Sequence, residues 1–514
     1  MRTAFLHICC VALTLSLASC GGETGSGGDA EPASLVPANA SMYFEATIRP
    51  EGEQRERVLA AAGKIMRAPD PAGRIRELVD DSFEDEDLSW EKDFAPWVGE
   101  RAGAWGTLRP GDEEPAIVAV IAVRDKDAAK AALPRLQDQG RTESYEGVDF
   151  VVDDSGTAAG LVDGWMVVGE PAGFKATVDA RDGDKLADSE RYDDVVDELD
   201  DERLGHYFLD TKALLDTALQ SDREAAAQFE QLRAFLPVDR LGPMAGSLSA
   251  DGDGVHLDQV LTDVPDGPLR RLASLFASGE SGLLPELPGD AWAAMGLPEA
   301  GEGTRELVTS FGGLIGGAAL TDQVRRETGL DLEADVYSWL GDVGVFVSGT
   351  SQQELGGAVV LESTDDDRAA TAFGKFVALI GRQAGVTPEP VRIEGAESAV
   401  AIAAPDTPGE LVLARGEGRM VLAYTRDAAA DALAPDAKLG DAPAYDAAEE
   451  ILGDDMAPSF VLSVPAVLEL VEAFGEADAE FEKARPYLEA FETIATGGSV
   501  DDGTVRSRTA VTLK

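Results

Sequence analysis

A nine-residue motif that occurs twice constrains the fold of this chain more than any other feature. Residues 91–99 are Glu-Lys-Asp-Phe-Ala-Pro-Trp-Val-Gly, and residues 333–341 are Glu-Ala-Asp-Val-Tyr-Ser-Trp-Leu-Gly. Glu, Asp, Trp and Gly recur at the same spacing, and Trp97 and Trp339 are 242 positions apart. Self-similarity at a fixed period is the sequence signature of a repeated structural unit. The chain is therefore predicted to contain two tandem homologous copies of one fold.

Further matches on both sides of the motif support this duplication. They keep the same order, and the separation of matched positions stays between 240 and 254 residues. The clearest pairs are Pro37 with Pro288, Ala40 with Ala291, Asp125 with Asp365, Tyr192 with Tyr445, and Gly246 with Gly498. We predict copy one over residues 35–264, a linker over residues 265–283, and copy two over residues 284–514.

Each copy alternates short apolar strands with amphipathic helices. Residues 116–123 are a continuous apolar run, and residues 150–168 contain three short runs separated by Asp-Ser-Gly and Asp-Gly turns. Strands joined by such tight turns pair antiparallel. Helical segments such as residues 53–66 carry one apolar face. The predicted fold class is α+β, with each copy a mostly antiparallel sheet and helices packed on one face.

The N-terminus resembles a bacterial lipoprotein signal. Arg2 precedes an apolar stretch that is too short to span a membrane, and this stretch ends in Leu-Ala-Ser before Cys20. The ending is similar to a lipobox, which implies removal of a signal peptide at residues 1–19. It also implies lipidation of the Cys20 thiol with diacylglycerol, for which palmitate is an expected acyl chain. The alternative is an ordinary secretory signal followed by an incidental cysteine.

A flexible tether is predicted after the signal. Residues 20–34 are rich in Gly and Ser, a composition typical of unstructured linkers. A flexible chain of about 14 residues spans roughly 20 Å on average. The folded body is therefore expected close to the cell membrane, on its extracytoplasmic face.

Short motifs give a resemblance to a known family. Besides the lipobox, they are Val-Pro-Ala-Asn-Ala at 36–40, Tyr-Phe-Glu at 43–45, Leu186, Tyr192, and Tyr-Phe-Leu-Asp at 207–210. Together they resemble the uncharacterised bacterial lipoprotein family of domain of unknown function (DUF) 3352. That family has no established activity, so the resemblance implies no catalytic residues. Copy two departs from the pattern at Ala294, which stands where copy one has Tyr43.

The charge balance argues against nucleic acid as a partner. The chain has 43 Lys and Arg against 96 Asp and Glu, a net charge of −53. Removal of residues 1–19 would lower the charge to −54, because Arg2 is their one charged residue. Such a body repels nucleic acids and anionic lipid surfaces. Since Cys20 alone of the three cysteines would remain, we expect neither a disulfide nor a thiol metal site.

Candidate catalytic and metal-binding residues are few. His206 and His256 fall in separate predicted strands, so both are predicted to be surface or edge-strand residues and not zinc ligands. Ser89 and Lys92 have the Ser-x-x-Lys spacing but lack its partner motifs. Residues 251–254, Asp-Gly-Asp-Gly, are predicted as a hairpin turn and not a calcium loop. We predict no catalytic residue, no metal site and no cofactor, with weak divalent-cation binding by acidic runs as the alternative.

A glycine-rich apolar segment motivates a second hypothesis. Residues 305–320 are predicted to form a helix with Leu307, Phe311 and Leu314 on one face. The segment contains four glycines, each of which costs about 1 kcal/mol in a helix relative to alanine. Close packing of the helix on the sheet explains the glycines, and a mobile lid over an apolar ligand is the alternative.

The sequence favours a membrane-anchored envelope lipoprotein with a non-enzymatic binding or scaffolding role. The lipid on Cys20 would hold it on the extracytoplasmic face of the cell membrane. The alternative is a carrier or sensor of an apolar, lipid-like ligand, and an enzyme with an acidic site is a third hypothesis. A protein or an apolar ligand is expected as the partner.

Overall fold

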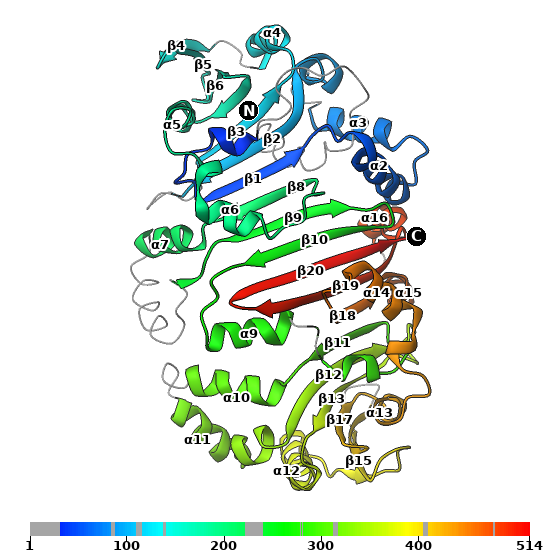
Figure 1. Ribbon diagram of the computed structural model, residues 1–514. Coiled ribbons are helices and arrows are strands. Elements are labelled where there is room, and N and C mark those ends of the chain that lie inside the picture. Colours follow the sequence, from blue (N-terminus) through cyan, green and yellow to red (C-terminus); the bar gives the residue numbers. More distant parts are fainter. Residues whose placement is uncertain are drawn as a thin grey trace. The chain divides into compact units, whose positions relative to one another are not determined.

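The computed structural model describes residues 31–83, 88–108, 116–136, 140–221, 240–277, 279, 281–311, 317–403, 410–475 and 478–514 (Figure 1). These residues form two compact units, which we call unit 1, up to Asp263, and unit 2, from Val264. The predicted signal peptide, Cys20 and most of the predicted tether lie outside the described residues. Among the described helices, none is long and apolar enough to cross a membrane.

Unit 1 is built on an antiparallel sheet with the strand order β4-β5-β6-β7-β3-β2-β1-β8-β9-β10. The strands are β1 (Met42–Thr47), β2 (Val98–Thr107), β3 (Ala116–Val123), β4 (Arg141–Tyr145), β5 (Val148–Val152), β6 (Ala158–Val162), β7 (Trp165–Gly169), β8 (Gly205–Leu209), β9 (Met244–Ala250) and β10 (Gly254–Leu261). The two residues between β6 and β7, Asp163 and Gly164, have φ values of +48° and +97°. Positive φ at both positions is what a type I′ hairpin turn requires.

Helix α3 of unit 1 begins at a residue that caps it. Pro71 opens α3, and the Oδ1 atom of the preceding Asp70 accepts a hydrogen bond from Gly73 N at 2.9 Å. The helical elements are η1 (Pro32–Leu35), α2 (Gly52–Met66), α3 (Pro71–Ser82), η3 (Trp90–Phe94), α4 (Lys126–Leu136), α5 (Pro171–Ala180), η4 (Leu186–Asp188), α6 (Glu190–Val196) and α7 (Thr211–Ser221).

Unit 2 has a sheet with the same strand order, β14-β15-β16-β17-β13-β12-β11-β18-β19-β20. The strands are β11 (Ala293–Leu297), β12 (Leu340–Ser348), β13 (Gly356–Ser363), β14 (Glu389–Pro390), β15 (Ser398–Ala403), β16 (Glu410–Gly416), β17 (Arg419–Ala423), β18 (Pro458–Ser463), β19 (Phe491–Asp501) and β20 (Thr504–Leu513). Its helical elements are α9 (Pro268–Ala277), η6 (Leu284–Glu286), α10 (Ala300–Phe311), α11 (Gly317–Thr328), η7 (Glu333–Tyr337), α12 (Asp366–Ala384), α13 (Arg426–Leu433), η8 (Leu439–Asp441), α14 (Pro443–Leu452), α15 (Val464–Phe474) and α16 (Ala479–Leu488). The fold class is therefore α+β with antiparallel pairing, as the sequence predicts.

Helix α9 occupies the segment that the sequence predicts as a linker, residues 265–283. Pro268 suggests a chain break in the sequence, but it is the first residue of α9. Proline is well tolerated at that position, because the amide hydrogen it lacks would have no partner within the helix. Arg271 of α9 donates to Glu299 at 3.0 Å and to Glu306 of α10 at 3.1 Å, so α9 packs as part of unit 2.

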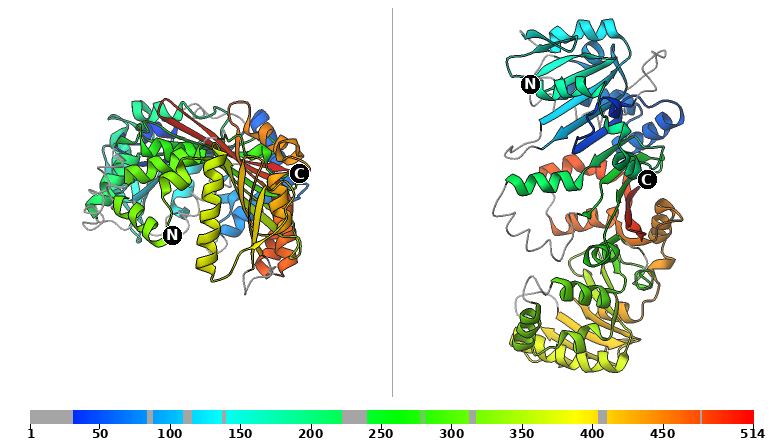
Figure 2. Two further views of the ribbon diagram at one scale, coloured as in Figure 1. Left: turned by 90° about the horizontal axis from the view of Figure 1, so that it is seen from below. Right: turned by 60° about the vertical axis from the view of Figure 1, so that its left-hand side comes forward.

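Helices cover both faces of each sheet, whereas the sequence suggests one. In unit 1, Val118 and Val120 belong to one buried cluster, and Ile121 and Val123 belong to another. Successive residues of a strand point to opposite faces, so β3 is buried on both sides. In unit 2, α12 packs on one face and α13 on the other (Figure 2). The continuous apolar run of residues 116–123 is the sequence pattern of such a doubly covered strand.

The two copies of the nine-residue motif fold in the same way. Each makes one π-helical turn, η3 or η7, shortly before strand β2 or β12 begins. Trp97 Nε1 donates a hydrogen bond to Asp93 O at 2.6 Å, and Trp339 Nε1 donates to Asp335 O at 2.7 Å. Both indoles are fully buried, with 1% and 0% of their surface exposed. Equivalent environments are what two copies would give, and the duplication itself stays a prediction.

An ion pair connects each π-helical turn to a helix of its own unit. Asp93 Oδ1 lies 2.9 Å from Arg135 Nη1 of α4, and Asp335 Oδ1 lies 2.6 Å from Lys375 Nζ of α12. The Asp93 and Asp335 side chains are 2% and 4% exposed, while both cations reach solvent. Buried carboxylates persist only with such partners. The recurring aspartate of the motif is therefore structural.

The glycine-rich segment 305–320 lies partly outside the described residues. Helix α10 ends at Phe311 and α11 begins at Gly317, and residues 312–316 between them are not described. A continuous helix over residues 305–320, and its proposed role as a lid, stay predictions.

Candidate functional site

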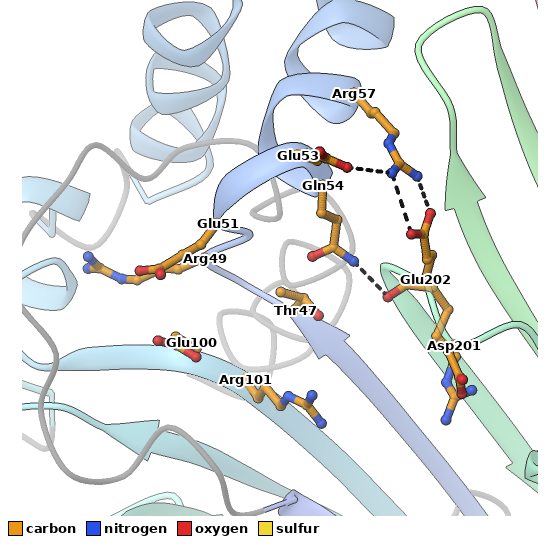
Figure 3. A pocket seen from close by; sticks show the side chains of 11 residues that line it. Thr47, Arg49, Glu51, Glu53, Gln54, Arg57, Glu100, Arg101, Asp201 and Glu202 are labelled. Carbon is orange, nitrogen blue, oxygen red and sulfur yellow. Dashed lines mark hydrogen bonds and ion pairs between the residues drawn. The ribbon is translucent and has the colours of Figure 1, made fainter.

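Unit 1 contains a cleft of about 420 Å³, which we call the charged cleft (Figure 3). Among its eleven described lining residues, four are arginines and five are carboxylates. They come from the end of β1 and the loop after it, the start of β2, the first two turns of α2 and the loop before β8. Ligands that carry both charge signs would find complementary groups in this cleft.

Strand pairing brings these distant segments together. Thr47 at the end of β1 is the register partner of Arg101 in β2. On its other side, Thr47 N donates to Leu204 O at 2.8 Å, so the loop that carries Arg203 lies beside β1. Gly52 then begins α2, which places the first turn of that helix at the rim of the cleft.

Polar contacts between α2 and the loop before β8 order one wall of the charged cleft. Arg57 forms an ion pair with Glu202 and lies 3.4 Å from Glu53 (Figure 3). Gln54 Nε2 donates to Arg203 O at 3.0 Å. Arg57 and Glu202 are 32% and 65% exposed, and ion pairs this exposed contribute little to stability. These contacts position side chains more than they stabilise the fold.

A buried polar network adjoins the charged cleft. Arg101 Nη1, which lines the cleft, lies 3.1 Å from Glu45 Oε1. Tyr43 donates from its hydroxyl to Glu45 Oε2 at 2.6 Å. Glu45 is also the register partner of His206 in β8, whose Nε2 lies 2.8 Å from the Tyr192 hydroxyl. We call these five side chains the polar network.

Burial governs protonation within the polar network. Burial, together with the nearby positive charges of Arg203 and Arg101, lowers the pKa of His206 to about 3. Burial also raises the pKa of Glu45, although the Tyr43 hydrogen bond and Arg101 oppose this. The pKa values of Tyr43 and Tyr192 are raised by burial as well. At neutral pH the network therefore contains a neutral imidazole and two protonated phenols.

The position of His206 corrects a prediction made from the sequence. The sequence suggests a surface or edge-strand residue, but β8 lies between β1 and β9, and His206 is 8% exposed. Its face of β8 also carries the fully buried Phe208, and this alternation is the signal that sequence reasoning missed. Burial is tolerated because the ring is neutral and hydrogen-bonded.

The remaining sequence candidates have structural contacts. Asp251 Oδ1 accepts from Asp253 N and Gly254 N at 3.0 and 2.7 Å, so residues 251–254 form the turn between β9 and β10. His256, also predicted as a surface or edge-strand residue, is buried with 9% exposed, and its Nε2 lies 2.9 Å from Asp251 Oδ2. Ser89 N donates to Asp93 Oδ2 at 2.9 Å. Within the described ranges, no group of three or more His, Cys, Asp or Glu residues could hold a metal ion.

Two positions of the polar network carry small side chains in unit 2. By strand order, Glu45 of β1 corresponds to Gly296 of β11, and His206 of β8 corresponds to Ser459 of β18. Ser459 is buried as well, but its hydroxyl donates to Thr496 O at 3.0 Å within the sheet. The same fold thus carries a charged network in unit 1 and small side chains at these positions of unit 2.

Comparisons with known proteins give a family but no activity. Residues 4–507 match the family described as "Protein of unknown function (DUF3352)". No curated protein matches the chain. Crystal forms I, IV and III of TP0453 match 48% of this chain and 87%, 85% and 87% of their own, at 10%, 11% and 10% identity. Their TM-scores of 0.26, 0.26 and 0.25 are too low to support any argument about fold or function.

Proposed function

We propose a function for this chain, which belongs to the family described as "Protein of unknown function (DUF3352)". It is a membrane-anchored envelope lipoprotein with a non-enzymatic binding role. In this proposal a lipid on Cys20 holds the protein at the extracytoplasmic face of the cell membrane. The charged cleft of unit 1 then binds a protein segment or ligand that carries both charge signs. The net charge of −53 makes nucleic acid an unfavourable partner.

The difference between the two units is the observation that carries the proposal. A buried charged network costs stability unless every member is paired, so a fold does not need one. Unit 2 has the same strand order with Gly296 and Ser459 in place of Glu45 and His206. The network and the cleft beside it in unit 1 therefore supply something other than fold stability, and recognition of a partner is the simplest role.

The protonation states of the polar network favour binding over catalysis. General acids and bases work best with a pKa near the operating pH. The pKa of His206 is about 3, and those of Tyr43 and Tyr192 are raised above their ordinary values. These groups therefore act at neutral pH as fixed hydrogen-bond donors and acceptors, and an enzyme with an acidic site is the less favoured hypothesis.

The lipid anchor predicts a large effect of one substitution. Cys20→Ser should leave the precursor uncleaved at this site and without its lipid, because serine offers no thiol for diacylglycerol. Labelling with radioactive palmitate should be lost, and the labelled band of the wild-type protein is the control. If Cys20→Ser carries the palmitate label as the wild type does, the lipoprotein assignment is wrong.

The charged cleft can be tested by photo-crosslinking in intact cells. A benzoylphenylalanine at Glu53, on the cleft rim, should form a discrete adduct in the full-length protein. The same photoreactive residue at Glu302, on α10 of unit 2, is the matched control and should form none. Arg203→Ala should weaken the Glu53 adduct several-fold, because it removes one of the four cleft arginines.

Two further results bear on the cleft proposal. Arg325→Ala, at an exposed ion pair with Asp331 in unit 2, should leave the adduct unchanged. Added salt should weaken the adduct, because it screens exposed charges. Equal adducts at Glu53 and Glu302, or an adduct that Arg203→Ala does not change, would remove the charged cleft from the proposal.

A further inference from the structure

A second pocket in unit 1, of about 370 Å³, differs from the charged cleft in its chemistry. It lies where the end of β2 and the start of β3 meet the first turns of α5 and α7, both labelled in Figure 1. All eleven of its described lining residues are uncharged, although 27% of the chain is charged. The two pockets share no described lining residue.

Small side chains create this space. Helix α5 lines it with Ala172 and Ala176, and α7 lines it with Ala213. Helix α5 lies directly on β3, because a Cβ atom at Gly173 would come within 2.4 Å of Val118 Cγ2. The helix is thus held in place by the sheet, and the pocket remains because alanines do not fill it. We call this pocket the alanine pocket.

Three polar side chains around the alanine pocket are hydrogen-bonded within the protein. Trp105 is 4% exposed, and its Nε1 donates to Thr177 Oγ1 at 3.1 Å. Ser41 Oγ donates to Gly106 O at 3.3 Å, and Thr217 Oγ1 donates to Ala213 O at 2.9 Å. The lining also includes the Asn39 amide and the Thr107 hydroxyl, so the pocket presents a surface that is uncharged and mostly apolar.

We infer that the alanine pocket binds an uncharged, unbranched hydrocarbon chain, such as that of a long-chain alcohol. Its volume of about 370 Å³ falls in the range of roughly 300–1,000 Å³ that is usual for small-molecule sites. No cation among its described lining residues could pair with a carboxylate, and the net charge of −53 disfavours anions in general. An ammonium group would find no carboxylate there either. The ligand class is therefore apolar and neutral.

Unit 2 offers a natural contrast to the alanine pocket. Helix α13 follows β17 as α5 follows β7, but its first turn carries Arg426 and Asp427. Arg426 forms an ion pair with Glu410, and Asp427 is exposed. A neutral chain would therefore meet charged groups at the start of α13. The binding site is assigned to unit 1, and it is independent of the charged cleft.

Titration of the full-length protein with 1-dodecanol tests this inference by calorimetry. We expect saturable binding of one dodecanol per chain, with dodecanoate and dodecylammonium at least tenfold weaker. Ala176→Leu and Ala213→Leu add bulk to the parts of the lining that α5 and α7 supply, and each should weaken dodecanol binding at least tenfold. Ala430→Leu, on α13 of unit 2, is the matched control and should leave the dissociation constant unchanged. Circular dichroism verifies that each variant is folded.

Several outcomes would overturn the inference. One is the absence of saturable dodecanol binding to the wild type. Another is equal affinity for dodecanol, dodecanoate and dodecylammonium. A third is an unchanged affinity for dodecanol in both Ala176→Leu and Ala213→Leu. Arg203→Ala should not alter dodecanol binding, since Arg203 lines only the charged cleft. The alanine-pocket inference therefore does not depend on the charged-cleft proposal. Either one can fail while the other is confirmed.

Discussion

Replacing Trp97 or Trp339 with alanine is expected to destabilise the unit that contains it by about 3–5 kcal/mol, the usual cost of removing a buried tryptophan. Both indoles are almost completely buried, so each substitution leaves a large cavity. Each also removes a hydrogen bond to a backbone oxygen, at 2.6 Å to Asp93 and at 2.7 Å to Asp335. The π-helical turn then loses the hydrogen bond that connects its backbone to the tryptophan just before the following strand.

Urea unfolding followed by circular dichroism would measure this loss. Trp292→Ala is the matched control, because Trp292 is only half-buried although its Nε1 also donates to a backbone oxygen, that of Gly349, at 2.9 Å. We expect a clearly smaller loss for Trp292→Ala than for either motif tryptophan. A loss below about 1 kcal/mol for Trp97→Ala or Trp339→Ala would contradict a shared structural role of the motif.

Acidification is expected to destabilise unit 1 through His206. Its folded pKa of about 3 lies below the ordinary value of 6.5, so the folded state resists protonation more than the unfolded state does. The contribution of His206 is complete above the unfolded pKa and is lost as the pH falls from 6.5 toward 3. The slope is about 1.4 kcal/mol per pH unit for one proton. Between pH 7 and pH 4.5 the loss should be about 2–3 kcal/mol.

Comparison with His206→Gln isolates this contribution from that of the many carboxylates. Both proteins share Glu45 of β1, Arg101 of β2 and Arg203 beside the network, so the difference in their pH dependence reports on His206. Wild type should lose about 2–3 kcal/mol more than His206→Gln between pH 7 and pH 4.5. Tyr192→Phe retains the imidazole and should keep most of the wild-type pH dependence. Identical pH profiles for wild type and His206→Gln would show that His206 is not held neutral by the fold.

Local sequence patterns determined the fold class. The α+β class and the antiparallel pairing follow from tight turns such as Asp163-Gly164, which require only neighbouring residues. The motif that contains Trp97 and Trp339 indicated equivalent positions, and both tryptophans have matching environments. Turns and short motifs can be predicted from sequence because the residues that interact in them are only a few positions apart in the chain.

The tertiary structure alone decided which polar residues meet. Glu45 and His206 are register partners in β1 and β8, although 161 positions separate them in the chain. An alternating strand that contains a histidine has the same sequence pattern whether that face is solvated or covered. Whether that face is buried depends on which strands lie beside the strand and which helix packs on the face. For β8 this helix is α6, which carries Tyr192. Long-range strand pairing, which no local pattern specifies, therefore placed the polar network, the charged cleft and the alanine pocket.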